Sequence, residues 1–153
     1  PDRPVGAIPP RANARCQLRF VVGTDPHDII PALRRHLDSH GFSEVAITTD
    51  EVMMNATRLD PDDPWAQLAV RSVTETIGHA PDLVPNLGGS LPNEVFTDTL
   101  GMPTVWVPHS YPACSQHAPN EHMLVPVVEE GLRIMTGIFW DVGALGAVPA
   151  PTG

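Results

Sequence analysis

The 153-residue sequence is long enough for one ordinary domain, or two small pieces, with a usable hydrophobic core. Its 9 basic and 18 acidic residues give a net charge of −9, which argues against nucleic acid or an anionic membrane as partner, because both require a basic face. No apolar run approaches the roughly 18 residues of a membrane span, and no secretory signal pattern is present.

The first residue and the two cysteines bear on what kind of protein the chain comes from. The sequence begins with proline instead of methionine, so we interpret it as a trimmed or excised piece of a longer protein. Cys16 and Cys114 lie far apart and form no CxxC pair. We expect them to be reduced thiols of a cytoplasmic protein.

The first 58 residues are expected to form a strand, a helix and a second strand. Polar and apolar residues alternate over 16–21, the period of a half-buried strand. Asp25 and Pro26 have the pattern of a helix start, and Gly41 suits its end. The second strand is expected from Val45 to about Arg58.

Two groups in this half resemble cation sites, but simpler interpretations are preferred. His36 and His40 are four residues apart and could hold a metal, yet no carboxylate at matching spacing completes a site. We expect a solvated helix face. The acidic run 60–63 (DPDD) lacks the periodic oxygen ligands and the glycine of a calcium loop. We expect a turn and a helix cap there, opening a helix that ends at Gly78.

The carboxyl-terminal half is expected to alternate short strands and helices. The strands are predicted at 83–86 and 102–107, with a helix from Asn93 to Leu100 between them. A long helix follows residue 121 and is expected to pack on a sheet. Its apolar stripe comprises Leu124, Val127, Val128, Gly131, Met135, Ile138, Phe139 and Val142.

Two stretches of this half carry chemistry. In the first, GGSLP (88–92), the glycines permit close backbone approach or positive φ, and Ser90 can cap the segment that follows. The second is the loop 108–121, PHSYPACSQHAPNE, which lies between an apolar run and the long helix. A neutral imidazole on a constrained loop, such as that of His117, can be a zinc ligand at roughly 2.0–2.1 Å.

The order GGSLPNEVF, LGMPTVWVP, HAPNE is more specific than any of its parts. With it, the stretch from Ile8 to about Val142 resembles the carboxyl-terminal part of the two-zinc exopeptidase and deacylase family. That family includes carnosine dipeptidases, acetylornithine deacetylase and succinyl-diaminopimelate desuccinylase. The resemblance implies an α/β (α+β) fold: half of a ferredoxin-like lid or dimerisation domain (1–58), then the last part of a zinc-exopeptidase-like α/β/α catalytic domain (59–143), and a flexible tail (144–153).

The resemblance also implies roles for individual residues. His117 would be the terminal ligand to one of two zinc ions, with cobalt or manganese as possible substitutes. Arg19 would bind the carboxylate of the substrate; from its position in the strand alone, it could equally be a solvated residue. The remaining implied roles are substrate-pocket lining for Gly88, Gly89 and Ser90, and support of the loop for Asn120 and Glu121, the latter at a helix start.

The implied parent enzyme is a cytoplasmic metallopeptidase or amidohydrolase, dimeric through its lid, that hydrolyses dipeptides or N-acyl amino acids. The family's other metal ligands and its general base are expected upstream of this chain, so we place no catalytic residue within it. Glu129 and Glu130 are not the family's glutamate pair, and Gly6 or Ala7 replaces a substrate-binding asparagine. Because one histidine cannot hold a zinc pair, the chain alone is expected to be inactive.

Two alternatives remain open at this stage. Cys114 could be a nucleophile with His117 as its base, although such pairs are usually assembled from distant segments. The chain could instead be a non-catalytic dimerisation or peptide-binding module that uses Arg19 and an exposed strand edge. An H-x-D and an E-E segment encoded upstream of Pro1 would favour the enzyme.

Overall fold

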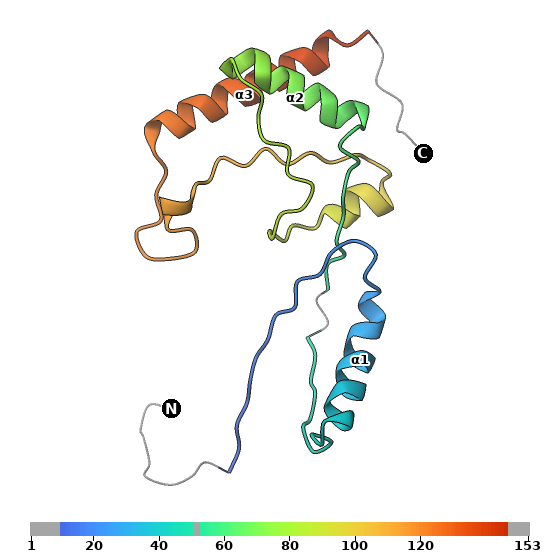
Figure 1. The fold of residues 1–153 in the computed structure, drawn as a ribbon. Coiled ribbons are helices and arrows are strands. Elements are labelled where there is room, and N and C mark those ends of the chain that lie inside the picture. The colour runs from blue at the N-terminus through green and yellow to red at the C-terminus, as the bar shows by residue number, and fades with distance from the viewer. Residues whose placement is uncertain (1–9, 51–52, 147–153) are drawn as a thin grey trace.

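The computed structural model describes residues 10–50 and 53–146. Its elements, in chain order, are α1 (Pro26–Ser39), α2 (Pro64–Ile77), the π-helical segment η1 (Val95–Thr99), the 3-10 turn η2 (Pro112–Cys114) and α3 (Val125–Ala144). Figure 1 shows α2 and α3 side by side, with the connecting chain beneath them and α1 standing apart. None of the described helices combines the length and apolarity needed to cross a bilayer.

The helix starts and stops follow the local signals in the sequence. The side chain of Asp25 accepts a hydrogen bond of 2.9 Å from the backbone N–H of His27, and Asp63 accepts one of 2.8 Å from Trp65. Each aspartate thus satisfies a backbone donor that the first helical turn leaves without a partner. Gly78 ends α2 in the left-handed region, at φ +85°. The predictions of α1 and α2 are confirmed.

The predicted α/β fold is wrong, because the described residues form helices and no strand. Neither the ferredoxin-like half nor the α/β/α segment is formed by residues 10–50 and 53–146. A strand forms only where a neighbouring strand exchanges backbone hydrogen bonds with it. The alternation in 16–21 shows which side chains would share a face, but it does not show that such a neighbour exists. The exposed ion pair Arg15–Asp50, 2.7 Å long, joins the residue just before the first predicted strand to the second predicted strand through side chains instead.

The core of the molecule lies between α2 and α3. Leu68 and Val73 of α2 and Ile134 of α3 are buried there. The two helices approach closely at Gly137, where an added Cβ would collide with the hydroxyl of Thr76. Small residues at a helix crossing allow such an approach, and the contact then excludes water from the apolar side chains around it. This pair is the only two-helix contact among the described elements.

The long predicted helix is confirmed as α3, and its predicted apolar stripe is covered only in part: Gly131 is buried and Val127, Met135, Ile138 and Val142 are half-buried. α3 approaches α2 at Gly137. Its buried residues are Gly131, which belongs to the predicted stripe and packs against His109, and Ile134, which does not belong to that stripe. Phe139, which the prediction placed in the packed stripe, is 73% exposed. Because α3 has apolar residues on more than one side, periodicity alone did not separate the covered apolar side chains from the exposed ones. The prediction that this helix packs on a sheet is wrong, because the described residues form no sheet.

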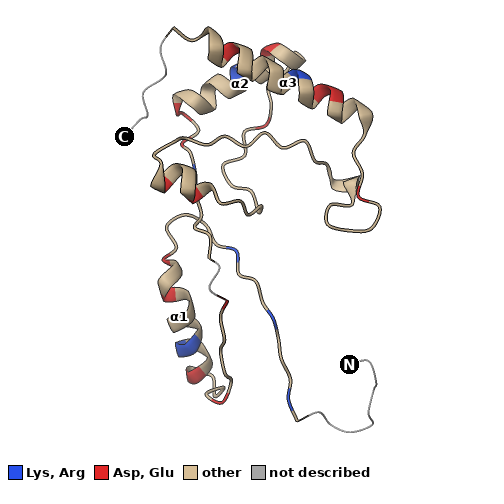
Figure 2. Ribbon diagram, turned by 180° about the vertical axis from the view of Figure 1, so that it is seen from behind, with Lys and Arg blue, Asp and Glu red and all other residues tan. Residues whose placement is uncertain are grey.

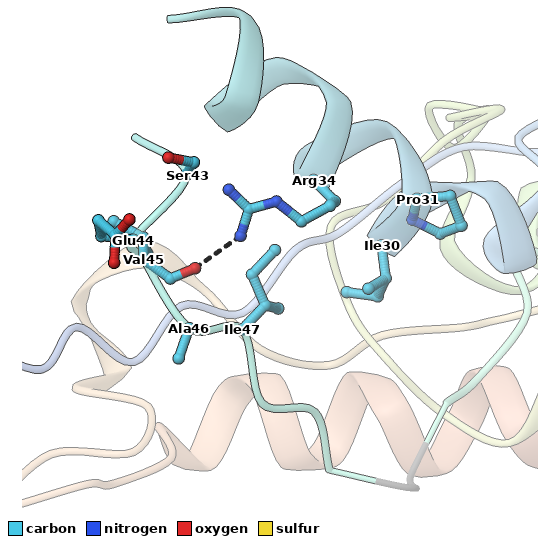
Figure 3. A pocket seen from close by; sticks show the side chains of 8 residues that line it. All are labelled: Ile30, Pro31, Arg34, Ser43, Glu44, Val45, Ala46 and Ile47. Carbon is cyan, nitrogen blue, oxygen red and sulfur yellow. Dashed lines mark hydrogen bonds between the residues drawn. The ribbon is translucent and has the colours of Figure 1, made fainter. Parts of the chain in front are cut away.

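α1 has no buried residue and is held mainly by polar contacts. The guanidinium of Arg34 donates to the carbonyl oxygens of Val45 (2.6 Å) and Phe42 (3.0 Å) and pairs with Asp38 at 2.7 Å. Figure 3 shows this arginine beside an open cavity of about 650 Å³ between α1 and the segment 43–47.

The predicted tail 144–153 is described only at its start, where Ala144 belongs to α3. Residues 147–153, like Gly6 and Ala7, lie outside the described residues.

Candidate functional site

The loop that precedes α3 is closed by its own backbone. His122 donates its backbone N–H to the carbonyl oxygen of Cys114 over 3.1 Å, which joins the two ends of the loop. Within it, Ala118 donates to Ser115 over 2.9 Å. The ring of Tyr111 meets that of His122 edge to face, with centroids 6.1 Å apart. These contacts hold residues 114–122 in one compact turn, which we call the histidine loop.

The histidine loop contains every described non-glycine residue with positive φ. These are Ser115 (φ +56°), His117 (φ +61°) and Asn120 (φ +63°). A non-glycine residue in the left-handed region costs about 1–2 kcal/mol, and less for asparagine. Such backbone strain persists where the surrounding contacts overdetermine it, and it is concentrated at functional sites. No pattern in the sequence indicates this conformation.

His117 is held by its backbone and presents an exposed side chain. Its N–H donates to Oε2 of Glu121 over 3.3 Å, and the carbonyl oxygen of Asn120 lies 2.8 Å from Nδ1 of His122. The predicted place of Glu121 at a helix start is wrong, since α3 begins at Val125. Glu121 instead braces the turn directly. The imidazole of His117 is thereby presented to solvent on a constrained backbone.

The glycine motif packs on an aromatic ring. A Cβ on Gly89 would lie 2.7 Å from Cζ3 of Trp106, so only glycine permits this approach. Nothing lies near the corresponding position of Gly88. The predicted cap by Ser90 is wrong, because Glu94 occupies the position before η1 and no side chain caps that segment. Ser90 is exposed.

The structure does not bring Arg19 to the histidine loop. Arg19 is exposed and makes no hydrogen bond or ion pair with another described residue. Figure 2 shows the basic residues of the segment 10–22 spaced along an extended chain that runs away from α2 and α3, whereas the histidine loop lies below α3. A shared substrate contact would therefore require the two parts to approach, or a second chain to supply one of them.

The described residues can supply one ligand of a metal site, but they do not form a complete site. No cluster of three or more His, Cys, Asp or Glu side chains placed to hold a metal occurs in 10–50 or 53–146. A catalytic zinc takes about three protein ligands, so His117 would need donors from outside these residues. His36 and His40 lie on the exposed surface of α1 with ring centroids 4.2 Å apart.

The structure does not favour Cys114 as a nucleophile. Its side chain is buried, and it makes no hydrogen bond to His117, which is exposed.

A histidine that the sequence patterns did not single out, His109, packs on the last helix. An ideal Cβ on Gly131 would lie 2.9 Å from its Nδ1, so this ring packs directly on the backbone of α3. Glycine at the buried position 131 is the signal that could have indicated a close neighbour.

Comparison of the chain with protein-family models, with curated proteins and with solved structures gives no match. The assignment of function therefore depends on the residues themselves.

Proposed function

We propose that this chain is the carboxyl-terminal portion of a cytoplasmic zinc-dependent metallopeptidase or amidohydrolase that hydrolyses dipeptides or N-acyl amino acids. The observation that carries the proposal is the histidine loop. It holds His117 at φ +61° with its N–H on Glu121 and its ring exposed. The position of this loop after GGSLP matches the motif order that led to the family resemblance.

In the proposed enzyme, His117 supplies one imidazole nitrogen to a zinc ion. When bound, a zinc pair supplies a hydroxide nucleophile and polarises the scissile carbonyl. The chain's own contribution is geometric. Glu121 fixes the backbone of residue 117, and the closed turn limits the positions that the imidazole can reach. Such preorganisation reduces the entropy lost when the metal binds.

The remaining metal ligands and the general base are proposed to come from another part of the full-length protein, because the described residues contain no three-ligand group. The isolated chain is therefore expected to show no hydrolysis. The full-length protein is expected to hydrolyse dipeptides and to lose that activity after dialysis against a chelator, with recovery on addition of zinc. Activity that survives complete removal of metal would contradict the proposal.

Arg19 tests the substrate part of the proposal. If its guanidinium binds the free carboxylate of the substrate, Arg19→Ala in the full-length enzyme should raise KM about 10- to 100-fold, the effect of losing a charge-assisted hydrogen bond. A substrate whose carboxylate is capped as an amide should be spared. Arg15→Ala is the matched control, since Arg15 is also exposed but is paired with Asp50. Equal loss on both substrates would remove Arg19 from this role.

A second candidate function, a non-catalytic dimerisation or peptide-binding module, is favoured by a different observation. The chain exposes 12508 Å² at a mass of 16.5 kDa. A compact monomer of this mass exposes about 7,500 Å². The excess of about 5,000 Å² includes many large apolar side chains, and such surfaces usually contact another protein. The chelator experiment separates the two candidates, since only the enzyme loses an activity.

A further inference from the structure

The end of α1 carries two histidines whose rings lie against each other. His36 and His40 are four residues apart, which places them on one face of the helix. His40 directly follows the helix, and its backbone N–H still bonds to the carbonyl oxygen of His36. The ring centroids are 4.2 Å apart and the ring planes are inclined by 32°. Both residues are exposed, so the pair faces solvent.

Hydrogen bonds at one nitrogen of His40 determine which of its nitrogens is free. Nδ1 lies 2.8 Å from the carbonyl oxygen of His36 and 3.0 Å from Oγ of Ser39. A carbonyl oxygen only accepts, so Nδ1 carries the proton and Nε2 of the neutral ring keeps its lone pair. The hydroxyl of Ser39 donates to the same carbonyl oxygen over 2.9 Å, which leaves Oγ as an acceptor for Nδ1. Metal-binding histidines commonly have this arrangement, in which the second ring nitrogen donates to a carbonyl oxygen.

The distance between the rings agrees with two imidazoles on one ion. With nitrogen–metal bonds of roughly 2.0–2.1 Å and an angle of roughly 90–110° at the metal, the two centroids would lie about 4.5–5.2 Å apart. The observed separation of 4.2 Å is a few tenths of an ångström shorter. The ring of His36 makes no hydrogen bond with another described residue, so small rotations about its side-chain bonds can supply the difference.

The charges around the pair permit a cation to bind there. The carbonyl end of a helix carries a partial negative charge, which stabilises cations near its last turn. Two arginines lie close by in the sequence, and each is paired with a carboxylate. Arg34 lies 2.7 Å from Asp38, and Arg35 lies 3.1 Å from Asp28. Their positive charges are therefore partly neutralised within α1.

We propose that His36 and His40 bind one divalent transition-metal ion through Nε2 of His40 and a ring nitrogen of His36. Water fills the other coordination positions, since residues 10–50 and 53–146 contain no group of three or more metal-binding side chains. Two imidazoles select Cu²⁺, Ni²⁺ or Zn²⁺ over Mg²⁺ and Ca²⁺, which take oxygen ligands. The ion bridges one turn of α1, a helix without a buried residue, and so stabilises its end. The proposal is independent of the proposed hydrolase, whose zinc ligand is His117.

Calorimetric titration of the full chain with Ni²⁺ tests the site. The chain should bind Ni²⁺ saturably and should not bind Mg²⁺. His36→Gln and His40→Gln should each weaken binding at least about tenfold, because even the outer hydrogen bonds of a metal site change its affinity 10- to 100-fold. The double variant should bind about as weakly as either single variant, since one remaining imidazole no longer chelates. His27→Gln is the matched control, because His27 is an exposed histidine of α1 without a second histidine at this spacing.

Amide hydrogen exchange tests the effect of the ion on α1. Zn²⁺ at ten times its Kd should slow exchange of the His40 amide about tenfold, because this N–H bonds across the bridged turn. The amides of α2 should be unaffected. Circular dichroism checks that the variants keep their helices, and the exchange measurement on the unmodified chain does not depend on them.

Four results would each overturn the proposal. The first is the absence of saturable binding up to about 1 mM Ni²⁺. The second is an unchanged Ni²⁺ affinity in His36→Gln, and the third is an equal loss of affinity in His27→Gln. The fourth is unchanged exchange of the His40 amide when Zn²⁺ is added.

Discussion

The two ends of the molecule obtain their helices in different ways. α2 and α3 bury apolar side chains against each other, whereas α1 buries none and depends on its caps and on the contacts of Arg34. Local signals in the sequence were sufficient to place both kinds of helix. Local signals therefore fix where a helix forms, while burial decides how much free energy of unfolding it contributes.

The largest difference between the two ends is expected from truncating one isoleucine in each. Ile134→Ala in the helix pair should lower the free energy of unfolding by about 2–4 kcal/mol, because it leaves a cavity in the core. Ile30→Ala in α1 should cost about 1 kcal/mol or less, since less apolar area is lost there. Their exposures are 6% and 39%. Urea unfolding measures both, and equal costs would contradict the contrast between a packed and an unpacked helix.

A smaller effect is expected from filling the crossing of α2 and α3. Gly137→Ala should destabilise the chain by about 1–2 kcal/mol, since the new methyl group collides with Thr76. Thr76→Ala in the same chain should recover most of that loss. Gly143→Ala on the same helix, where nothing lies within 4 Å, should instead stabilise by up to about 1 kcal/mol. Thermal unfolding would contradict the close crossing if both glycine variants behaved alike.

The smallest effect is expected in the histidine loop. Ser115→Gly removes a side chain from a left-handed backbone and should raise the free energy of unfolding by up to about 1 kcal/mol. Ser110→Gly, at a neighbouring exposed serine without positive φ, should lower it by several tenths of a kcal/mol, because the unfolded chain gains freedom. The same sign for both variants in urea unfolding would contradict the strained turn.

The sequence predicted the helices well because their signals are local. The Asp-Pro pairs at 25–26 and 63–64 and the glycine at 78 mark helix ends through contacts with residues close in the chain. The strands failed because pairing depends on a distant partner. Alternation in 16–21 is compatible with a sheet, but it does not supply the second strand.

The candidate site was predicted only in part, for a related reason. The position of His117 on a loop before a long helix was visible in the sequence. Its positive φ and its contact with Glu121 depend on closure of the turn by His122 and Cys114, which no periodicity reports. The apolar residues on several sides of α3 likewise concealed which members of the predicted stripe are exposed, such as Phe139.

The zinc content of the full-length protein tests the central proposal most directly. Metal analysis after exhaustive buffer exchange should find two zinc ions per chain, and His117→Ala should lose one of them together with most of the turnover. His79→Ala serves as the control, since His79 is also exposed but lies outside the histidine loop. A His117→Ala protein that keeps both zinc ions and its full rate would contradict the account.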